Sequence, residues 1–600
     1  MMKSASVQEA MSRAVQLHQA GRLPEAAAIY RQVLQQEPNH ANALHLLGLA
    51  AHQSGDHHGA VRTIAQAIRA NPMAAEFHNN LGEAFRSLGM ADQAAQCYET
   101  AIGLKPGYAE AHANLGSALL QMGRLDEAVS AYRRAIELKG DIAGVHSNLG
   151  QALHAKGLLD EAIVAFRRSI ELRGDFPNTH FHLANALKDK GRGEEAVAAY
   201  RRAIALRPDF AAAHNRLGDA LRDVGRLDET VPAYRRAVEI NPGFVEAQNN
   251  LAGALAATGQ VEKALAECRR TLELRPDLAA AHLTRAMLLL LTGCFAEGWA
   301  EYEWRWEWAG APSPMRDPTQ PVWRGEDPRG RAILVQAEQG FGDTIQFIRY
   351  APLLAQRGAR VIVECRPELK PLLQALEGVE QVLAEGEPLP PCDLRLPLLS
   401  APLAFRTTLE TVPANVPYLR PDPARVDQWR SRLAPRSTPV APRLKVGLAW
   451  AGKPVNMADW YRSMPLSSLA PLADVKDVRF YSLQKGSGEQ AANAPAPMAL
   501  CDLTNELRDF ADTAALIANL DLVITVDTAV AHLAGAMAKP VWTLLPFVPE
   551  WRWLLDREDS PWYPTMRLFR QKTRGDWAGV VERVAGELNR RVQGSEFRVQ

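Results

Sequence analysis

The sequence predicts two regions of different fold class: an N-terminal all-α solenoid and a C-terminal α/β region of two doubly wound lobes. A strict period of 34 residues fills the first half of the 600-residue chain. After it, short apolar runs rich in β-branched residues alternate with helical patterns, which is typical of parallel sheets. Two stretches rich in proline separate these parts. Because a single core rarely grows beyond ~250–300 residues, a chain of this length must divide into domains.

Four columns of residues define the repeat. A glycine recurs every 34 residues, at positions 21, 55, 89, 123, 157, 191, 225, 259 and 293. In the same register each second helix carries a small residue such as Ala128 and a large one such as Tyr132, and a breaker such as Pro106 closes most units. Glycine permits a tight turn between two helices, and helix pairs that cannot bury their apolar faces alone must stack. The pattern resembles the tetratricopeptide repeat, with eight units and an altered ninth from 279 to about 310.

One polar column is expected to face the concave groove of the array. Its members are Asn80, Asn114, Asn148, His182, Arg216 and Asn250. Asn offers both a donor and an acceptor, so it can bind an extended backbone; a solvated helix face is the alternative. Arrays of the O-GlcNAc transferase type carry Asn before a Leu-Gly pair, and three of these positions resemble them. Stacked helical arrays usually bind a peptide or protein. We therefore expect a polypeptide in the groove, contacted by Asn80, Asn114, Asn148 and Asn250.

A second column, of histidine, invites a metal-site interpretation. Its members are His78, His112, His146, His180, His214 and His282. Equivalent positions in successive repeats lie on the order of 10 Å apart, given the distances between packed helices. Zinc requires its ligands at ~2.0–2.1 Å. The column therefore predicts packing residues on the first helix of each unit.

The end of the repeats is dense in tryptophan, at 299, 304, 306 and 308. An aromatic helix at the end of a solenoid predicts an interface with the next domain. We expect the following organisation: repeat superhelix 1–310, connector 311–330, N-terminal lobe 331–420, proline-rich linker 421–443, and C-terminal lobe 444–600 with the nucleotide-sugar site.

Composition excludes several classes of protein. The 68 basic and 68 acidic residues leave no net charge, so nucleic acid is not an expected partner. Six cysteines without a CxxC pair argue against a disulfide framework and a zinc site, and they fit a reducing compartment. The start, MMKSASVQEAMSRAV, lacks the apolar segment of a signal peptide, and no apolar run approaches the ~20 residues of a membrane helix. We expect a cytoplasmic protein with no membrane span.

Polar motifs follow two of the predicted strands. In AEQGFGDT, Gly340 and Gly342 let the backbone turn tightly near a ligand. Asp343 begins the next helix, either as a helix cap or as a carboxylate that takes a proton from an acceptor hydroxyl. In SLQKGSG, Lys485 is either a solvated loop residue or a cation that neutralises a phosphate leaving group.

A third motif, LVITVDTAVAH, ends a buried strand with Asp527 and Thr528 and begins a helix that carries His532. Helix N-termini bind anions through free N–H groups and the helix dipole. Thr528 and His532 are four residues apart and share a helix face. His532 by itself indicates a core histidine, whereas the three residues together favour a phosphate site.

Residues of about 331 to 590 resemble glycosyltransferase family 9, the bacterial ADP-heptose lipopolysaccharide heptosyltransferases, which have the GT-B fold. Members carry GD early, a lysine at the start of the second lobe, and D-T/S-G-x-x-H late. This chain has GFGDT, SLQKG and DTAVAH, with Ala529 where the family has Gly. The resemblance implies that Asp343 is the catalytic base. It further implies phosphate binding by Lys485, Thr528 and His532, with Asp527 as a positioning residue. Arg462, in YRSMPL, and the glycines Gly340 and Gly342 are further candidates for substrate binding.

We therefore expect a protein O-glycosyltransferase. The repeats would hold a polypeptide acceptor, flagellin being one candidate, and the GT-B region would transfer a sugar from a nucleotide-sugar to Ser or Thr. The chain lacks the D-x-D pair that holds a divalent ion, so no metal or other cofactor is expected. The architecture is similar to that of O-GlcNAc transferases and flagellin-modifying transferases. Two alternatives stay open: a non-catalytic interaction scaffold, suggested by Ala529, and a transferase that acts on a glycan or lipopolysaccharide.

Overall fold

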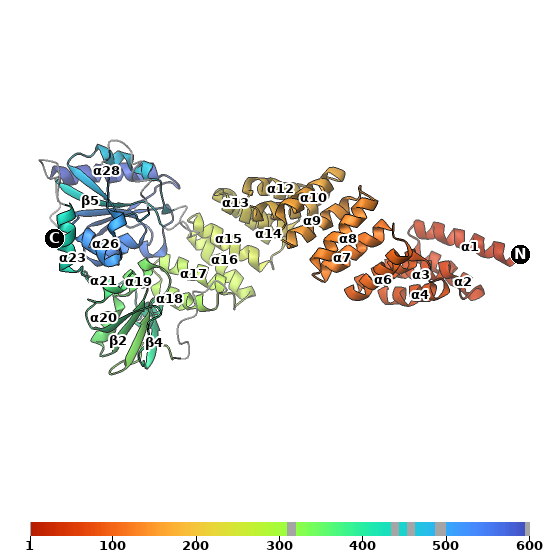
Figure 1. The fold of residues 1–600 in the computed structure, drawn as a ribbon, viewed down its shortest axis with the longest axis horizontal. Coiled ribbons are helices and arrows are strands. Elements are labelled where there is room, and N and C mark those ends of the chain that lie inside the picture. Colours follow the sequence, from red (N-terminus) through yellow and green to blue (C-terminus); the bar gives the residue numbers. More distant parts are fainter. Residues whose placement is uncertain are drawn as a thin grey trace. The chain divides into compact units, whose positions relative to one another are not determined.

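The computed structural model describes residues 2–308, 320–433, 443–452, 462–486, 498 and 500–594. The chain divides into two compact units, residues 1–247 and 248–600. Paired helices build the first unit and begin the second, and parallel sheets with helices build the rest of the second (Figure 1). The predicted fold classes, an all-α solenoid followed by an α/β region, are confirmed. The helices of the last repeats, from residue 248 onward, belong to the same compact unit as the sheets.

The helices of the repeats have nearly constant lengths, such as 13 residues in α3 and 14 in α4. The first unit contains α1 (Met2–Gln19), α2 (Leu23–Gln36), α3 (Ala41–Gln53), α4 (His57–Ala70), α5 (Ala75–Ser87), α6 (Ala91–Leu104), α7 (Ala109–Gln121), α8 (Leu125–Leu138), α9 (Ala143–Ala155), α10 (Leu159–Leu172), α11 (Pro177–Asp189), α12 (Gly193–Leu206), α13 (Ala211–Asp223) and α14 (Leu227–Ile240). The helical part continues with α15 (Val245–Ala257), α16 (Val261–Leu274), α17 (Ala279–Leu291), α18 (Phe295–Tyr302) and the 3-10 helix η1 (Glu303–Trp306). No helix among the described residues is long and apolar enough to cross a membrane.

Two glycine columns explain how each helix pair closes. The glycines between paired helices all have positive φ, from 73° at Gly123 to 88° at Gly55, as the turn prediction requires. A second glycine lies on the first helix of most pairs. A Cβ at Gly116 would lie 2.8 Å from the ring of Tyr132, and one at Gly218 would lie 2.5 Å from the ring of Tyr234. The large residue of the second helix therefore packs directly on the backbone of the first.

The histidine column closes the turns between successive repeats. In each member Nε2 lies 2.9–3.1 Å from the carbonyl oxygen six residues earlier, as in His112 to Pro106 and His282 to Pro276. A carbonyl oxygen only accepts, so this ring nitrogen donates. The described part of the chain contains no group of three or more His, Cys, Asp or Glu side chains able to hold a metal ion. The histidines of the column are buried or half-buried on the first helices, and each makes a hydrogen bond that the sequence did not predict.

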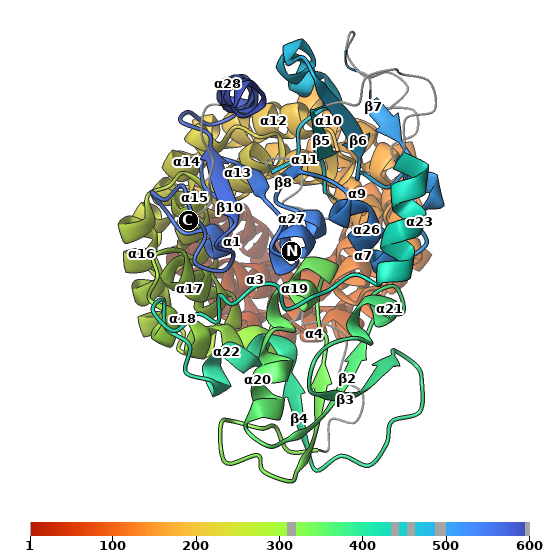
Figure 2. The ribbon, with the colours of Figure 1, turned by 90° about the vertical axis from the view of Figure 1, so that its left-hand side faces the viewer.

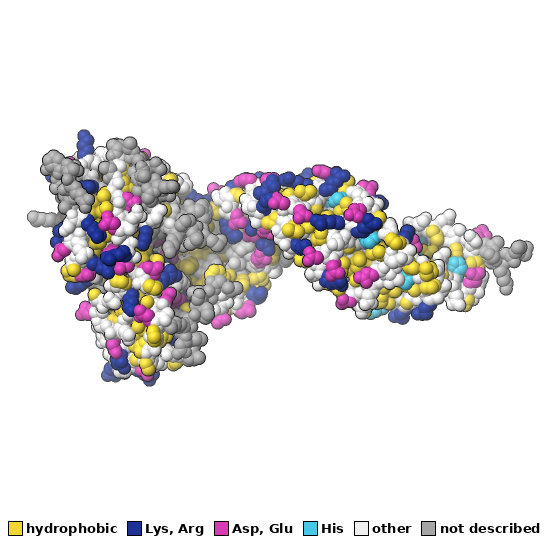
Figure 3. Space-filling model, viewed as in Figure 1, with side chains coloured by type: hydrophobic (Ala, Val, Ile, Leu, Met, Phe, Trp, Pro, Cys, Tyr) yellow, Lys and Arg dark blue, Asp and Glu magenta, His cyan; other side chains and the backbone are white. Residues whose placement is uncertain are grey.

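Ion pairs link the second helices of successive repeats. Arg133 lies 2.7 Å from Glu161, and Arg167 lies 3.1 Å from Glu195, each from guanidinium nitrogen to carboxylate oxygen. On the face of the first unit that Figure 3 shows, basic and acidic side chains alternate, and neither sign forms a continuous patch. Exposed pairs of this kind stabilise a protein by less than about 1 kcal/mol each, so buried packing holds the repeats together.

The first sheet has the order β3-β2-β1-β4, and every strand pair is parallel. Its strands are β1 (Ala332–Gln336), β2 (Arg360–Cys365), β3 (Val379–Ala384) and β4 (Leu394–Pro397). The associated helices are α19 (Phe341–Phe347), α20 (Tyr350–Gln356), α21 (Lys370–Leu373), η2 (Leu398–Ser400) and α22 (Ala401–Ala404). All five residues of β1 are buried, which explains the apolar run of its first four residues.

The second sheet has the order β10-β9-β8-β5-β6-β7 and is also parallel throughout. Its strands are β5 (Leu444–Ala449), β6 (Val478–Ser482), β7 (Leu500–Asp502), β8 (Leu522–Val526), β9 (Val541–Leu545) and β10 (Met566–Arg570). Its helices are η3 (Leu466–Asp474), η4 (Thr504–Glu506), α26 (Phe510–Ala518), α27 (Ala529–Ala536), η5 (Trp551–Trp553) and α28 (Trp577–Gln593). The strand order reverses between β5 and β8, and ligands of such folds bind at the carboxyl ends of strands beside such a reversal.

The stretch expected as a proline-rich linker contains a packed helix, α23 (Pro423–Leu433). Its Trp429 is 1% exposed. Arg425 pairs with Asp509 at 2.7 Å and with Asp512 at 3.0 Å beside α26. Proline suits the first turn of a helix because its missing N–H has no partner there in any case. The proline-rich stretch between the two lobes therefore contains the start of a helix, at Pro423, in addition to connecting segments.

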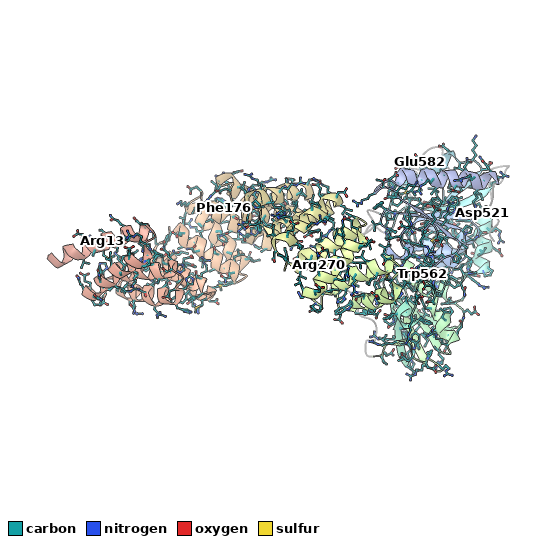
Figure 4. All side chains as sticks on the ribbon, turned by 180° about the vertical axis from the view of Figure 1, so that it is seen from behind. Arg13, Phe176, Arg270, Asp521, Trp562 and Glu582 are labelled. Atoms are coloured by element: carbon teal, nitrogen blue, oxygen red, sulfur yellow. The ribbon has the colours of Figure 1, made fainter. Side chains whose placement is uncertain are left out.

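Trp299 of α18 joins the last repeat to both sheets. Its side chain is 1% exposed and packs edge to face on Phe347 of α19 and Trp551 of η5, with ring centroids 6.1 and 5.2 Å apart. Trp562, labelled in Figure 4, lies in the same aromatic cluster, 5.7 Å from Phe347. The predicted aromatic interface between the repeats and the following domain is confirmed for Trp299.

Candidate functional site

Two helices that begin at strand ends meet between the sheets. α19 follows β1 and α27 follows β8, and the two helices lie side by side (Figure 2). A Cβ at Gly342 would lie 3.0 Å from Cδ2 of His532 and 3.6 Å from Cα of Ala529. Sequence analysis expected the glycines of GFGDT to permit close approach of a ligand. In the structure it is α27 that approaches Gly342, and the ligand role stays a prediction.

Asp343 occupies the first turn of α19 and is bound on both carboxylate oxygens. Oδ2 accepts the N–H of Gly340 at 2.8 Å, as a capping residue does. Oδ1 accepts a hydrogen bond from Nη2 of Arg552 on η5. The side chain is 19% exposed. Asp343 therefore caps α19, as one of its two predicted roles requires. Capping does not explain its hydrogen bond with Arg552, which connects the regions of the two sheets.

Arg552 is the centre of the site, and sequence analysis missed it. Its guanidinium donates to Asp343, to Glu550, and to Oε1 of Gln346 at 2.5 Å, and its side chain is 9% exposed. A buried arginine with carboxylate partners from two elements fixes the planar fork in one orientation. The stretch PEWRW offered a signal, because an arginine between two tryptophans is expected to be enclosed.

Glu550 is the second functional candidate that sequence analysis missed. It caps η5, and Oε2 accepts the N–H of Arg552 at 3.0 Å. Burial of the carboxyl group raises the pKa of Glu550 to about 7, against the attraction of Arg552 and with the help of nearby Asp527. Its side chain is 30% exposed, the most of any carboxylate in the cluster Asp343, Asp527 and Glu550. A carboxyl group with such a pKa can exchange a proton near neutral pH.

The corner at the end of β8 holds a buried acid and a neutral histidine. Burial raises the pKa of Asp527 and lowers that of His532 well below its ordinary value, an effect that Arg552 strengthens for the histidine. Nε2 of His532 lies 3.9 Å from Oδ1 of Asp527, and Nδ1 lies 2.9 Å from the hydroxyl of Tyr563. The ring also stacks on Trp553, with centroids 5.3 Å apart. His532 therefore has the surroundings of a satisfied core histidine, and phosphate binding by it stays a prediction.

Thr528, Arg462 and Lys485 have different surroundings. Thr528 begins α27, and its Oγ1 lies 3.1 Å from Oγ1 of Thr525. Arg462 lies near enough to lower the pKa of both Asp527 and His532. Lys485 is exposed in the turn after β6, and within the described ranges no ion pair engages it. The structure thus gathers Gly342, Asp343, Arg462, Asp527 and His532 with Arg552, and no recorded contact joins Lys485 to them.

Arg349, at the start of α20, ties the two sheets together beside this cluster. Nη1 donates to the carbonyls of Pro413 at 2.9 Å and Trp562 at 2.8 Å, and Nη2 donates to the hydroxyl of Tyr418 at 2.9 Å. Arg349 is 3% exposed. A buried cation held by two segments more than sixty residues away in sequence fixes α19 and α20 against the second sheet.

The asparagines of the repeats are half-buried and partly engaged with neighbouring side chains. Nδ2 of Asn80 lies 2.8 Å from Nε2 of His45, and Nδ2 of Asn114 donates to Oδ1 of Asn79 at 3.1 Å. Oδ1 of Asn148 accepts from Gln151 at 3.5 Å, and Asn250 is half-buried on α15. Oδ1 of Asn80 also accepts from Asn79 at 3.3 Å. Each amide has two donor hydrogens and two acceptor lone pairs, so one or two such bonds do not exhaust its capacity. Groove contact by Asn80, Asn114, Asn148 and Asn250 stays a prediction.

Family comparisons place both halves of the chain. Residues 2–216 match the Cilia and flagella-associated protein 70 C-terminal domain, and residues 221–288 match the Tetratricopeptide repeat. Residues 484–550 match Glycosyltransferase family 9 (heptosyltransferase). That segment runs from Lys485 through Asp527 and His532 to Glu550. The chain thus joins tetratricopeptide repeats to a segment that matches glycosyltransferase family 9.

Individual proteins that are similar to this chain each align with only part of it. Protein FlbA of Caulobacter vibrioides (strain ATCC 19089 / CIP 103742 / CB 15) is 29% identical over 343 residues, 51% of this chain and 54% of FlbA. This chain thus spans about half the length of the curated relative that it matches. The crystal structure of MamA is 26% identical with a TM-score of 0.27, covering 28% of this chain and 93% of MamA. YrrB, a TPR protein with an unusual peptide-binding site, is 24% identical with a TM-score of 0.29, covering 31% of this chain and 96% of YrrB.

Proposed function

We propose that the chain is a protein O-glycosyltransferase of GT-B type: the repeats bind a polypeptide, and the α/β region transfers a sugar from a nucleotide-sugar to its Ser or Thr. The observation that carries the proposal is the bridge from Asp343 to Glu550 through Arg552. It joins a carboxylate in the first turn of α19 to the segment that matches family 9. Tetratricopeptide repeats in the same chain make a polypeptide the favoured acceptor.

The proposed reaction is a single displacement. The acceptor hydroxyl oxygen forms a bond to the anomeric carbon, while the bond from that carbon to the diphosphate oxygen breaks and its electron pair leaves with the nucleoside diphosphate. The hydroxyl proton passes to a carboxylate, assigned to Asp343. The free N–H groups at the start of α27, Thr528, Arg462 and Lys485 would hold the diphosphate, which makes transfer independent of a metal in this proposal.

Glu550 is a second candidate for the proton acceptor. Asp343 is engaged by Arg552 and by the N–H of Gly340 at 2.8 Å, whereas Glu550 is more exposed, and burial raises its pKa to about 7. A base accepts a proton best when its pKa is near the working pH. The acceptor would then approach from the side of η5.

The test compares two carboxylates that each accept a backbone N–H in the first turn of a helix. Asp343→Asn should lower turnover of the nucleotide-sugar by at least about 10²-fold, as loss of a general base does. Asp576→Asn is the matched control, because Asp576 accepts the N–H of Gly579 at 2.8 Å at the start of α28. Equal turnover in both variants would overturn the assignment of Asp343, and a loss confined to Glu550→Gln would transfer the role to Glu550.

Two separate experiments identify the sugar donor and the acceptor. Each nucleotide-sugar of a panel is added to the full chain, and a bound donor raises the unfolding temperature by mass action. Candidate acceptors, flagellin among them, are co-expressed and weighed intact, since each transferred sugar adds its mass. A mass increase on a co-purified glycan and none on protein would favour the glycan-transferase alternative.

A non-catalytic scaffold is the other alternative, and the identity of residue 529 suggests it. Cα of Ala529 lies 3.6 Å from the position that a Cβ of Gly342 would take, so the start of α27 is close to α19. Ala529 adds a methyl group where the family motif has Gly. A chain that binds its partner protein but hydrolyses and transfers no nucleotide-sugar would establish the scaffold.

A further inference from the structure

The ninth repeat differs from most others in the partner of its large residue. In four of the earlier units the tyrosine hydroxyl of the second helix donates to a polar side chain on the first helix, fifteen residues earlier. These pairs are Tyr98 to Glu83, Tyr132 to Ser117, Tyr200 to Asn185 and Tyr234 to Asp219, at 2.5–3.0 Å. In the first unit the hydroxyl of Tyr30 lies 3.4 Å from Nδ1 of His18, twelve residues earlier. For Tyr302 the residue fifteen earlier is Met287, which offers no such acceptor.

Tyr302 bonds to the transferase region instead. Its hydroxyl accepts from Nε2 of Gln339 at 3.0 Å, and the side chain is 3% exposed. Gln339 has φ of 62°, the left-handed region that is uncommon for residues other than glycine. It stands in the loop between β1 and α19, one residue before Gly340. Strained residues persist where surrounding contacts hold them and are concentrated at functional sites.

Arg305, one turn after Tyr302, holds the preceding residue of the same loop. Nε and Nη2 donate to the two carboxylate oxygens of Glu338 at 3.0 and 2.9 Å. Arg305 is 2% exposed and Glu338 is 8% exposed. Oε1 of Glu338 also accepts the N–H of Leu399 at 3.0 Å. Successive loop residues, Glu338 and Gln339, are therefore both fixed from the ninth repeat.

The effect of this fixation reaches Asp343. Gly340 follows Gln339 directly, and its N–H donates to the Asp343 carboxylate at 2.8 Å. Tyr302 itself lies close enough to Asp343 and Arg552 for both charges to act on its hydroxyl, although burial is the main reason that its pKa rises to about 12. The ninth repeat thus fixes the conformation of the loop between β1 and α19, and this loop in turn positions the carboxylate of Asp343.

We propose that Tyr302 and Arg305 are positioning residues for glycosyl transfer, so that the ninth repeat forms part of the transferase active site. The proposal rests on the proposed function, because it assigns Tyr302 an effect that acts through Asp343. A transferase fragment beginning at residue 331 would lack both contacts to the loop. The repeats would then have two separate tasks: the earlier units bind the acceptor, and the ninth sets the geometry of the catalytic carboxylate.

The test uses two hydroxyl deletions in the full chain. Tyr302→Phe removes the bond to Gln339 and keeps the aromatic packing, and we expect kcat to fall about tenfold or more with KM for the donor within twofold. Tyr234→Phe is the matched control, since its hydroxyl donates to Asp219 at 2.7 Å within the array. It should leave kcat unchanged. Equal kcat in Tyr302→Phe and the unsubstituted chain would overturn the proposal, as would equal losses in the two variants.

A double-mutant cycle separates positioning from a general loss of folding. Gln339→Ala removes the partner of Tyr302, and the double variant Tyr302→Phe with Gln339→Ala should lose no more kcat than the worse single variant. If the fold-loss of kcat in the double variant equals the product of the two single losses, the two side chains act independently and the proposed coupling is wrong. If the unsubstituted chain turns over no nucleotide-sugar, the proposed function fails and the inference with it. An active chain that is insensitive to Tyr302→Phe contradicts the inference alone.

Discussion

In the repeats many polar side chains find their partners a short and fixed distance along the chain, whereas at the junction of the two sheets some partners lie about two hundred residues apart. Histidine rings donate to carbonyls six residues earlier, and tyrosine hydroxyls to side chains fifteen residues earlier. By contrast, Arg552 reaches Asp343 across 209 residues, and Arg349 reaches the carbonyl of Trp562 across 213. A substitution in the array should therefore act on one repeat, and one at the sheet junction on the whole second unit.

The largest expected effect is from Arg305→Met. It leaves the buried carboxylate of Glu338 without its cation, so we expect a loss of about 3–5 kcal/mol in the free energy of unfolding of the second unit. All 13 tryptophans lie at or after residue 299, so tryptophan fluorescence during urea unfolding reports this unit.

Arg134→Met is the control for that loss. Arg134 pairs with Glu137 at 2.8 Å, but their side chains are 52% and 64% exposed. The expected loss is below about 1 kcal/mol, followed by far-UV circular dichroism. Similar losses for the two arginines would contradict the distinction between local and long-range pairing.

The next effect concerns two glycines that each make room for a ring. Gly342→Ala forces α19 away from His532 and should lower turnover about tenfold or more, because small displacements of catalytic groups are costly. Gly116→Ala presses on Tyr132 within one repeat and should lower stability by roughly 1–3 kcal/mol without changing kcat. Gly586→Ala in α28 meets no atom within 4 Å and serves as the control that should stabilise the chain slightly.

A smaller effect is the pH dependence of turnover. Because burial raises the pKa of Glu550 to about 7, the carboxylate form is lost as the pH falls through that value. If Glu550 accepts the proton, kcat/KM should fall about tenfold per pH unit below 7 and level off above it. The same profile in Glu550→Gln would exclude Glu550 as the group that titrates.

The smallest effect is expected for His112→Ala. It removes one hydrogen bond, of 3.1 Å to the carbonyl of Pro106, from one turn of the array. The free energy of unfolding should fall by about 0.5–1.5 kcal/mol, with turnover unchanged. Loss of turnover in this variant would contradict the local character of the repeat contacts.

Features that depend on neighbouring residues were predictable from the sequence, whereas those that depend on distant residues were not. The glycine period predicted the turns because each turn needs its own positive φ. The apolar runs of the second half that predicted strands were RAILVQAE, ARVIVEC, LKVGLAWAG, RFYSLQ, LDLVITV and KPVWTLL, and they form β1, β2, β5, β6, β8 and β9. The strands β3, β4, β7 and β10 were missed, because β4 and β7 are only four and three residues long and β3 is exposed at its first half. Asp343, Asp527 and His532 were selected by motif, and the structure brings them together around Arg552.

Arg552, Glu550 and Tyr302 could not be selected in that way. Their significance depends on which groups face them, and those partners come from other elements of the second unit. Tyr302 even conforms to the repeat register, so its sequence position indicates a packing residue like Tyr234. The replacement of a polar residue by Met287 fifteen positions earlier was the available signal.

The sequence by itself determined the repeat, the two fold classes and the strand-end motifs, because these depend on backbone preference and burial within a few dozen residues. Only the tertiary structure decided that the loop between β1 and α19 is held by the last repeat, and that one buried arginine joins the carboxylates of two sheets. The physical reason is that a buried charge must find its partners in space, and sequence separation places no limit on where they lie.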